Sequence, residues 1–258
     1  MAVVPADNSF AVRLNRGMMH LSRHWLRYML LLVAIYVGVP FTAPVMMRIG
    51  WTEPAYTIYT MYSFVCHQYA FRSWFLFGEQ PVYPRAAANL TDLKSFESYS
   101  TEINQGNSSP VDLTQWDRPL IDTARAFVGD TKMGYKVAFC ERDVAIYGGF
   151  LIGGLIFAIP YVRRRLRPVP LWLYGLLGIV PIGIDGFSQL LSEPPLMFWA
   201  QRESTPAFRT LTGLLFGLMN AWLAFPYLEA SMRDAYNEIR DKFRRRDERL
   251  VAQSGKSA

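Results

Sequence analysis

The stretch YMLLLVAIYVGVPFTAPVMM, residues 28–47, decides the fold class of this chain, because it contains no charged side chain. A helix of about 20 apolar residues is long enough to cross the hydrocarbon core of a bilayer. The stretch starts too late and runs too long for a cleaved signal peptide, and no small-residue cleavage site follows it. We therefore predict an uncleaved membrane span here.

The composition favours a protein that crosses the bilayer several times. The chain has 258 residues, of which 51% are hydrophobic, and a formal net charge of +6. Long apolar runs alternate with basic clusters, which is the pattern of membrane topology rather than of nucleic-acid binding. We therefore expect the lipid bilayer, and no nucleic acid, to be the partner of the basic residues.

We predict an all-α polytopic membrane protein with four transmembrane helices, near residues 28–47, 144–162, 169–191 and 211–228. Basic clusters lie near the N-terminus, at residues 163–167 and in the C-terminal tail. The positive-inside rule puts all three clusters on one side only if there are four spans. We therefore expect both termini to be cytoplasmic and the membrane to be the plasma (inner) membrane.

The remaining segments are assigned by this topology. Residues 55–77 form an interfacial or re-entrant helix at the outer face, because the uncharged run there is marginal in length for a span. Residues 1–27 form a cytoplasmic amphipathic segment with a disordered start, and residues 229–258 form a charged cytoplasmic helix and tail. Residues 80–136 form a polar extracytoplasmic insertion with a short helix at 117–128, too poor in aliphatic residues to fold alone. The insertion and the C-terminal helix are the candidate surfaces for a membrane-protein partner.

Polar side chains in or beside the apolar runs converge at one depth. Asp185 lies 16 residues after Val169, which is about 24 Å along the third span and close to the outer interface. Ionisable residues within a membrane are costly and usually face the bundle interior or a wet cavity. We predict a polar pocket of Arg72, Arg142, Asp185, Gln189 and Arg209, in which Arg209 or Arg142 pairs with Asp185. The alternative is a structural salt bridge that locks the bundle.

Small residues predict close helix packing at the same level. Gly149 and Gly153 form a small-xxx-small pair in the second span. Gly213 and Gly217 form another pair in the fourth span, and such pairs let two helices approach closely. Pro181 loosens the third span, which can free backbone carbonyls to line a cavity.

The two cysteines lie on the outer side in this topology, and three states are open to them. Cys66, His67, Cys140 and Asp143 supply two thiolates, an imidazole and a carboxylate, a set that suits zinc in a tetrahedral site. A disulfide between Cys66 and Cys140 is the main alternative, and two free thiols are the third state. The catalytic role is unassigned, with Asp185, Asp143 and His67 as the candidates for an acid or a base.

Four motifs stand in order along the chain. They are Cys66-His67-Gln68 with Arg72-Ser73 and Phe77-Gly78; Cys140-x-Arg142-Asp143-x-Ala145-Ile146-Tyr147-x-Gly149; Asp185-Gly186 with Gln189; and Arg209 with Thr212-Gly213 and Gly217. Together they resemble the uncharacterised membrane family called domain of unknown function 2085, over about residues 28–228. The resemblance implies a shared architecture and site, and no reaction, because the family has no agreed biochemical role.

The chain departs from that family in two respects. Many members carry a further cysteine where Asp143 stands, so a metal site here loses one soft ligand. Members also usually join the first motif to the second by a short loop, where this chain inserts residues 80–136. We interpret the insertion as an added outer cap over the site.

The sequence therefore predicts an integral membrane protein of unknown biochemical role, with a polar site at the outer leaflet that is metal-binding or pinned by a disulfide. One alternative is an accessory subunit of a membrane complex, in which the polar residues form a bundle-locking network. Another is a membrane enzyme acting on a lipid-linked or anionic substrate that the arginines hold. A carrier is least favoured, because no inverted repeats are present in the sequence.

Overall fold

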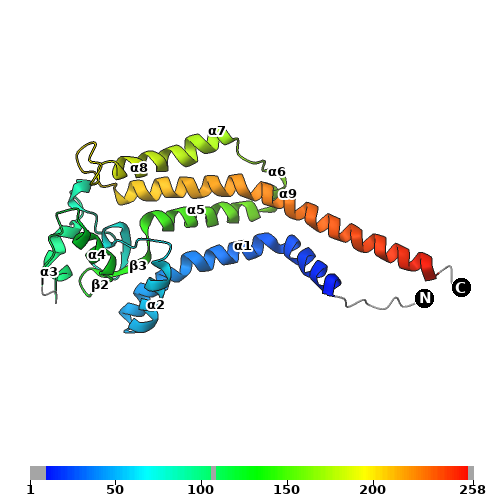
Figure 1. The fold of residues 1–258 in the computed structure, drawn as a ribbon, viewed down its shortest axis with the longest axis horizontal. Helices are drawn as coiled ribbons and strands as arrows, with labels where there is room; N and C mark the ends of the chain where they lie inside the picture. Colours follow the sequence, from blue (N-terminus) through cyan, green and yellow to red (C-terminus); the bar gives the residue numbers. More distant parts are fainter. Residues whose placement is uncertain (1–9, 106–108, 255–258) are drawn as a thin grey trace.

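The structure, a computed structural model, describes residues 10–105 and 109–254. Long helices lie side by side in a bundle, and a smaller mixed domain covers one end of it (Figure 1). The bundle helices are α1 (Phe10–Arg48), α5 (Glu141–Ala158), the helix formed by α7 (Leu171–Tyr174), η4 (Gly175–Ile179) and α8 (Val180–Leu190), and α9 (Pro206–Ser254). Of the predicted terminal segments 1–27 and 229–258, residues 1–9 and 255–258 lie outside the described residues.

Three helices among the described residues are long and apolar enough to cross a membrane: Phe10–Arg48, Leu171–Leu190 and Pro206–Gln253. They contain most or all of the predicted first, third and fourth spans. The second predicted span, 144–162, falls largely in α5, which lies in the bundle but is not among the three. Its first turn carries Glu141, Arg142 and Asp143. The four-span arrangement is therefore not confirmed by these helices alone.

The outer surface of the bundle is apolar. Leu32 on α1, Leu155 on α5 and Ile184 on α8 are 66%, 55% and 61% exposed. Large aliphatic side chains exposed around a helical bundle are typical of a surface that faces lipid.

The all-α prediction is incomplete, because a small antiparallel sheet joins the two parts of the molecule. Its strands are β1 (Ser73–Leu76), β3 (Gly134–Cys140) and β2 (Gly129–Asp130), in the order β1-β3-β2. The strand β3 runs directly into α5, so the sheet is continuous with the bundle.

The predicted helix over residues 55–77 is shorter in the structure. Helix α2 covers Thr52–Tyr62, and the chain then passes through the 3-10 turn η1 (Ala70–Arg72) into β1. Gln68 has a φ of +54°, a left-handed conformation that a helix cannot continue through. Pairing of Phe75 with Lys136 of β3 supplies partners for the backbone that follows.

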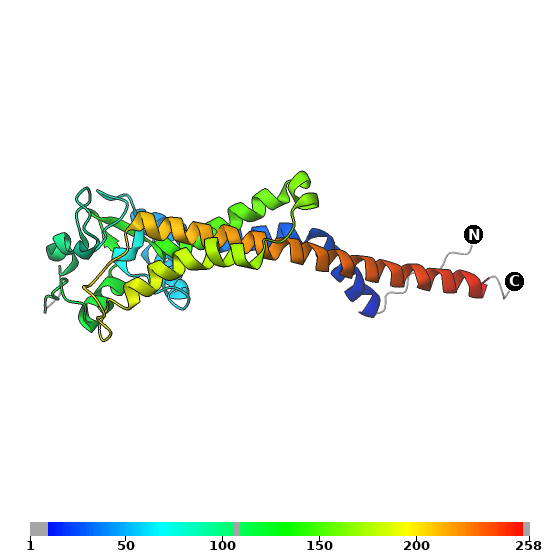
Figure 2. The ribbon, with the colours of Figure 1, turned by 90° about the horizontal axis from the view of Figure 1, so that it is seen from above.

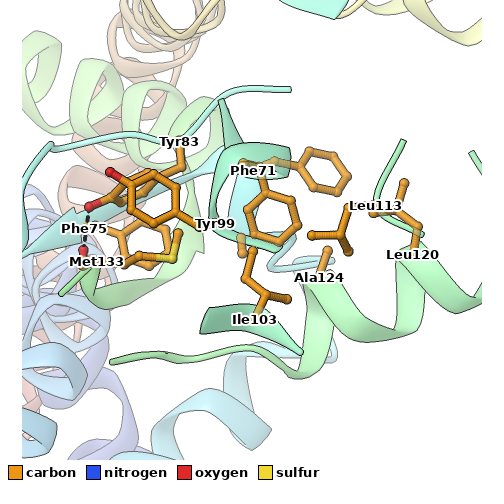
Figure 3. Packing of buried hydrophobic residues seen from close by; sticks show 11 residues of the cluster. Phe71, Phe75, Tyr83, Tyr99, Ile103, Leu113, Leu120, Ala124 and Met133 are labelled. Carbon is orange, nitrogen blue, oxygen red and sulfur yellow. Dashed lines mark hydrogen bonds between the residues drawn. The ribbon is translucent and has the colours of Figure 1, made fainter. Parts of the chain in front are cut away.

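The core of the insertion is rich in aromatic side chains, which pack together with Ile103, Leu113 and Leu120. Its other elements are η2 (Ala86–Ala88), η3 (Phe96–Tyr99), α3 (Ser100–Ile103) and α4 (Arg118–Ala126). Phe71 and Phe75, which precede the insertion, pack with Tyr83 and Tyr99 inside it (Figure 3). The predicted helix at 117–128 is confirmed as α4, and Asp117 caps it by accepting a hydrogen bond from the Leu120 N–H at 2.9 Å. The insertion is thus built onto the segment that leads into β1.

Glycines bring α5 and α9 into close contact, as the sequence predicts. A Cβ added at Gly149 would lie 2.6 Å from the carbonyl oxygen of Leu214, and one at Gly213 would lie 2.9 Å from that of Arg142. A Cβ at Gly217 would collide with the carbonyl oxygen of Ile146. Backbone groups cannot retreat as a flexible side chain can, so the two helices can be this close only where glycine stands.

The third bundle helix contains a π-helical turn, η4, directly before Pro181. Proline has no N–H to donate to the preceding turn and its ring crowds the carbonyl there, which disturbs the regular helix. The predicted loosening of this helix therefore occurs on the N-terminal side of the proline.

The basic clusters lie at the end of the molecule opposite the sheet. The start of α1, the short helix α6 (Pro160–Arg165) and the C-terminal half of α9 are all found there (Figure 1), and α9 extends far beyond the bundle (Figure 2). Glu229 on α9 accepts a hydrogen bond from the Trp25 indole at 2.9 Å and pairs with Arg163 at 2.6 Å. One carboxylate thus joins α1, α6 and α9.

Candidate functional site

A polar cavity of about 330 Å³ lies where the sheet meets the bundle. It is lined by Val65, Cys66, His67, Gln68, Tyr69, Arg72, Cys140, Arg142, Asp143, Gln189 and Arg209. The structure therefore brings together every residue that the sequence assigned to the polar pocket or the metal set, with one exception. Asp185 is fully buried and lies behind Arg142 instead of lining the cavity.

The sheet holds the Cys66 loop against the start of α5. Ser73 of β1 pairs with Cys140 at the end of β3. The buried amide of Gln68 donates to the carbonyl of Tyr59 at 2.9 Å and to that of Ala138 at 3.0 Å. One side chain thus ties the loop to α2 and to β3, which explains why the left-handed turn at Gln68 is maintained.

Cys66, Cys140 and Asp143 form a compact group in this cavity. One ligand atom from each residue lies within 4.8 Å of the other two. The Cys140 N–H donates to the Cys66 sulfur at 3.2 Å, and the Cys140 thiol donates to the Asp143 carboxylate at 3.1 Å. Cys140 is also the N-cap of α5, where the helix dipole favours negative charge.

Both cysteines are free thiols in the structure. The hydrogen bond with Cys66 and burial, together with the nearby Asp143 charge, raise the pKa of the Cys140 thiol well above its ordinary value. His67 lines the same cavity but is exposed, and its ring lies 5.4 Å from that of Tyr69. Of the four residues predicted to bind a metal, Cys66, Cys140 and Asp143 therefore lie close together, and His67 is not part of this group.

Asp185 pairs with Arg142 at 2.5 Å, which is one of the two partners predicted for it. Arg202 lies on the other side of the carboxylate at 3.6 Å. Arg209, the other predicted partner, is 2% exposed and binds Glu203 and Glu141 instead. Its guanidinium is thus held by two buried carboxylates, one from α5 and one from the loop before α9.

Arg72 connects the cavity to the insertion. Its guanidinium binds Glu203 at 2.8 Å and Glu193 at 2.9 Å. It also lies 5.3 Å from the ring centre of Trp116, within the range of a cation–π contact. The sequence reasoning did not identify Glu193 and Glu203, although two carboxylates in a short loop between apolar helices are an indication of buried partners.

Several buried polar atoms at the site have no hydrogen-bond partner among the described residues. Two of them, the Gln189 Nε2 and the Arg142 Nε, are donors on residues that line the cavity. Buried donors without a partner are costly, so their presence at a cavity wall indicates a site that an acceptor group satisfies.

Lys136 is a further buried group that the sequence did not single out. It is fully buried in β3, and its ammonium donates to the carbonyls of Gln68 at 2.9 Å and Arg125 at 2.7 Å. Burial is the main cause that lowers the pKa of Lys136 to about 7. This lysine therefore supports the wall of the cavity from behind.

Comparison with known proteins agrees with the motif resemblance. Residues 126–223 match the model of the family described as "Predicted membrane protein (DUF2085)", and this range contains the second, third and fourth motifs. The resemblance to this family is therefore confirmed. The chain is also similar to the "Uncharacterized protein MJ1492" of Methanocaldococcus jannaschii, with 21% identity over 80% of this chain and 93% of the relative. No solved structure matches the chain.

Proposed function

We propose that this chain is a four-span integral membrane protein that binds a divalent metal ion of the zinc type in the cavity at its extracytoplasmic face. The observation that carries the proposal is the group of two sulfurs and one carboxylate within 4.8 Å of one another. Zinc prefers sulfur, nitrogen and carboxylate ligands in a tetrahedron.

The length of α5 supports the fourth span. Its 18 residues extend about 27 Å, of which the 15 uncharged residues after the first turn provide about 22 Å of the roughly 30 Å of a hydrocarbon core. Its charged first turn then lies at the outer interface, beside the sheet. The basic clusters at the opposite end of the molecule are on the cytoplasmic side by the positive-inside rule. Both termini are therefore cytoplasmic, and the insertion faces outward.

The topology is tested in intact cells with a membrane-impermeant maleimide. In a Cys66→Ser/Cys140→Ser background, a cysteine introduced at Asp92 in the insertion is expected to react, and one at Ala252 on α9 is expected to react only after the cells are opened. Labelling of both positions, or of Ala252→Cys alone, would refute this orientation.

Three protein ligands leave one tetrahedral position open. His67 on the cavity wall is the candidate for this position, and its ligation would give a closed site of the structural type. If water fills it, the metal is of the catalytic type, a Lewis acid that lowers the pKa of the bound water. Backbone N–H groups already point at both sulfurs, at 3.2 Å for Cys66 and 3.4 Å for Cys140. Such contacts support thiolate ligands.

The metal proposal is tested by elemental analysis of purified, reduced, full-length protein. We expect about one zinc-type ion per chain and its loss in Cys140→Ser and Asp143→Asn. His67→Ala separates the two coordination types, since it lowers metal occupancy only in the closed site. His24→Ala is the matched control, because this histidine lies on α1 and does not line the cavity. Metal-free reduced protein would refute the proposal.

Alkylation of the unfolded chain without reductant distinguishes the metal site from a disulfide. Two labels per chain exclude a bridge between Cys66 and Cys140. No labels indicate a bridge, and the thiols are then unavailable as ligands.

A second candidate, an accessory subunit with a locked bundle, is favoured by the buried ion pairs. The arginines Arg72, Arg142, Arg202 and Arg209 pair with the carboxylates Glu141, Asp185, Glu193 and Glu203. In this case the insertion or the C-terminal helix would contact a membrane-protein partner. An Asp185→Asn protein that loses thermal stability would support the lock, whereas a stable protein that loses its cellular phenotype would assign Asp185 to a functional site.

A further inference from the structure

An apolar groove of about 760 Å³ opens on the lipid-facing side of the bundle, next to the polar cavity. Helices α1, α2, α5 and α9 form its walls, with Tyr36, Tyr62, Tyr147 and Phe150 among the lining residues. On α1 the groove extends from Val39 to Leu32, which is about 10 Å along the helix axis. On α5 the lining residues Ile146 and Phe150 lie about 8 and 14 Å from Glu141 along the helix axis, so the groove lies within the outer leaflet, whose hydrocarbon is about 15 Å thick.

The groove and the polar cavity adjoin through two helical turns. Tyr62 lines the groove and Cys66 lines the cavity, and the Cys66 N–H donates to the Tyr62 carbonyl at 2.9 Å. Tyr147 lines the groove and Asp143, one turn earlier on α5, lines the cavity. A polar compartment at the outer interface therefore leads directly into an apolar one that runs inward.

The polar compartment offers donors to a ligand. Arg72, Arg142 and Arg209 line it together with one carboxylate, Asp143, whereas the carboxylates that pair with the three arginines are not among the lining residues. The unpartnered Arg142 Nε and Gln189 Nε2 add two buried N–H groups to this wall. Several guanidinium N–H donors in one cavity are suited to the oxygens of a phosphate group.

We propose that the ligand of this site is a membrane-dissolved lipid with a phosphate head group, whose head occupies the polar cavity and whose hydrocarbon chain occupies the groove. The lipid enters sideways from the outer leaflet, between α1 and α5. The proposal rests on the proposed function in one respect, since it takes the polar cavity to be the ligand site. It does not depend on the identity of the metal.

The proposal is tested with the full-length protein in nanodiscs and two photoactivatable probes, phosphatidic acid and diacylglycerol with the same diazirine-labelled chain. We expect at least about fivefold more labelling by phosphatidic acid, with crosslinked peptides that contain residues 32–39 or 146–150. Equal labelling by the two probes, or crosslinks elsewhere, would overturn the proposal.

Two variants of α1 isolate the groove from the rest of the lipid-facing surface. Leu32 and Leu31 are both exposed, at 66% and 60%, but only Leu32 lines the groove. We expect Leu32→Trp to fill the groove and to lower phosphatidic acid labelling at least about fivefold, whereas Leu31→Trp leaves it unchanged. An equal effect of the two substitutions would show that the probe labels the whole lipid-facing surface and not the groove.

The head group is tested with Arg142→Gln combined with Asp185→Asn, which removes both partners of one ion pair and leaves no carboxylate without its arginine. This double variant is expected to remove the preference for phosphatidic acid over diacylglycerol. Calorimetric titration with inorganic phosphate tests whether the site binds free phosphate instead of a lipid head group. Phosphate binding that needs Arg142 but is unaffected by Leu32→Trp, without any lipid preference, would assign the site to free phosphate and overturn the lipid proposal.

Metal content measured on the same samples distinguishes the two proposals. Selective lipid labelling of a protein that binds no metal would support the lipid site and refute the metal site. A protein that binds metal but labels equally with both probes would leave the proposed function in place and refute the lipid site.

Discussion

Lys136 supports the wall of the polar cavity, and its burial makes the free energy of unfolding depend on pH. Replacement of Lys136 by methionine tests this dependence. In the folded protein burial lowers the pKa of Lys136 to about 7, from an ordinary value of 10.5. Between these two values the unfolded chain binds a proton at this residue and the folded chain does not. The free energy of unfolding must therefore rise as the pH rises through this window.

The magnitude follows from the size of the window. Each pH unit above the folded pKa contributes up to about 1.4 kcal/mol. We restrict the measurement to pH 7–8.5, because cysteines in the unfolded chain ionise with a pKa of about 8.5 and oppose the rise increasingly at higher pH, and the comparison with Lys136→Met cancels their contribution within the window. The stability of the native protein is then expected to rise by about 2 kcal/mol across the window from this residue alone.

The assay compares native protein and Lys136→Met at each pH in the same detergent. Denaturant unfolding gives the free energy, and amide hydrogen exchange of residues 66–72 gives the local free energy of opening where Lys136 holds the Gln68 carbonyl. The variant is expected to lack the rise of about 2 kcal/mol.

Lys132→Met is the control for this experiment. This lysine is exposed, and its hydrogen bond with Glu102 raises its pKa, so it stays charged in both states over the window. Its removal is expected to leave the pH slope unchanged. Equal slopes in the native protein and in Lys136→Met would refute the reasoning, since the buried lysine would then be charged in the folded state.

Three further predictions concern packing and ion pairs. Gly217→Ala is expected to cost about 1–3 kcal/mol by overpacking the α5–α9 contact, whereas Gly148→Ala, with nothing near its added Cβ, is expected to be neutral or slightly stabilising in thermal unfolding. Arg209→Met is expected to cost about 3–5 kcal/mol, because it leaves the buried Glu141 carboxylate without its partner and Glu203 with Arg72 alone. Glu229→Gln is expected to cost about 1–2 kcal/mol and to raise proteolysis at the basic end, where the carboxylate holds Trp25 and Arg163. Unchanged unfolding temperatures in Gly217→Ala, Arg209→Met or Glu229→Gln would contradict the role assigned to the corresponding contact.

The members of the polar cavity could be predicted from the sequence because depth along a membrane helix is a simple function of residue number. A rise of 1.5 Å per residue and alternating span directions put Asp185 and Arg142 at one level. The two residues indeed form an ion pair at 2.5 Å. The same argument could not choose between Arg142 and Arg209 as the partner, because it fixes height and leaves the direction of each side chain open.

The sheet could not be predicted in the same way. Ser73 pairs with Cys140 across 66 intervening residues, and hydrophobic periodicity reports only local structure. The uncharged stretch after residue 55 therefore predicted a longer helix than α2. Lys136 was missed for the same reason, since its acceptors on Gln68 and Arg125 are brought to it by the sheet and the insertion. Glu203 was missed because it reaches Arg209 and Arg72 from a loop without periodicity.

The position of Cys140 explains why the insertion is more than a cap over the site. This residue ends β3 and begins α5, so it belongs at once to the outer domain and to the bundle. Its partner in the sheet, Ser73, lies directly after Arg72, and Phe71 on the other side is fully buried in the aromatic core of the insertion. Any displacement of that core would shift Arg72 on the cavity wall. The insertion therefore holds the cysteine and arginine sides of the cavity at a fixed separation, which a metal site and a phosphate site both require.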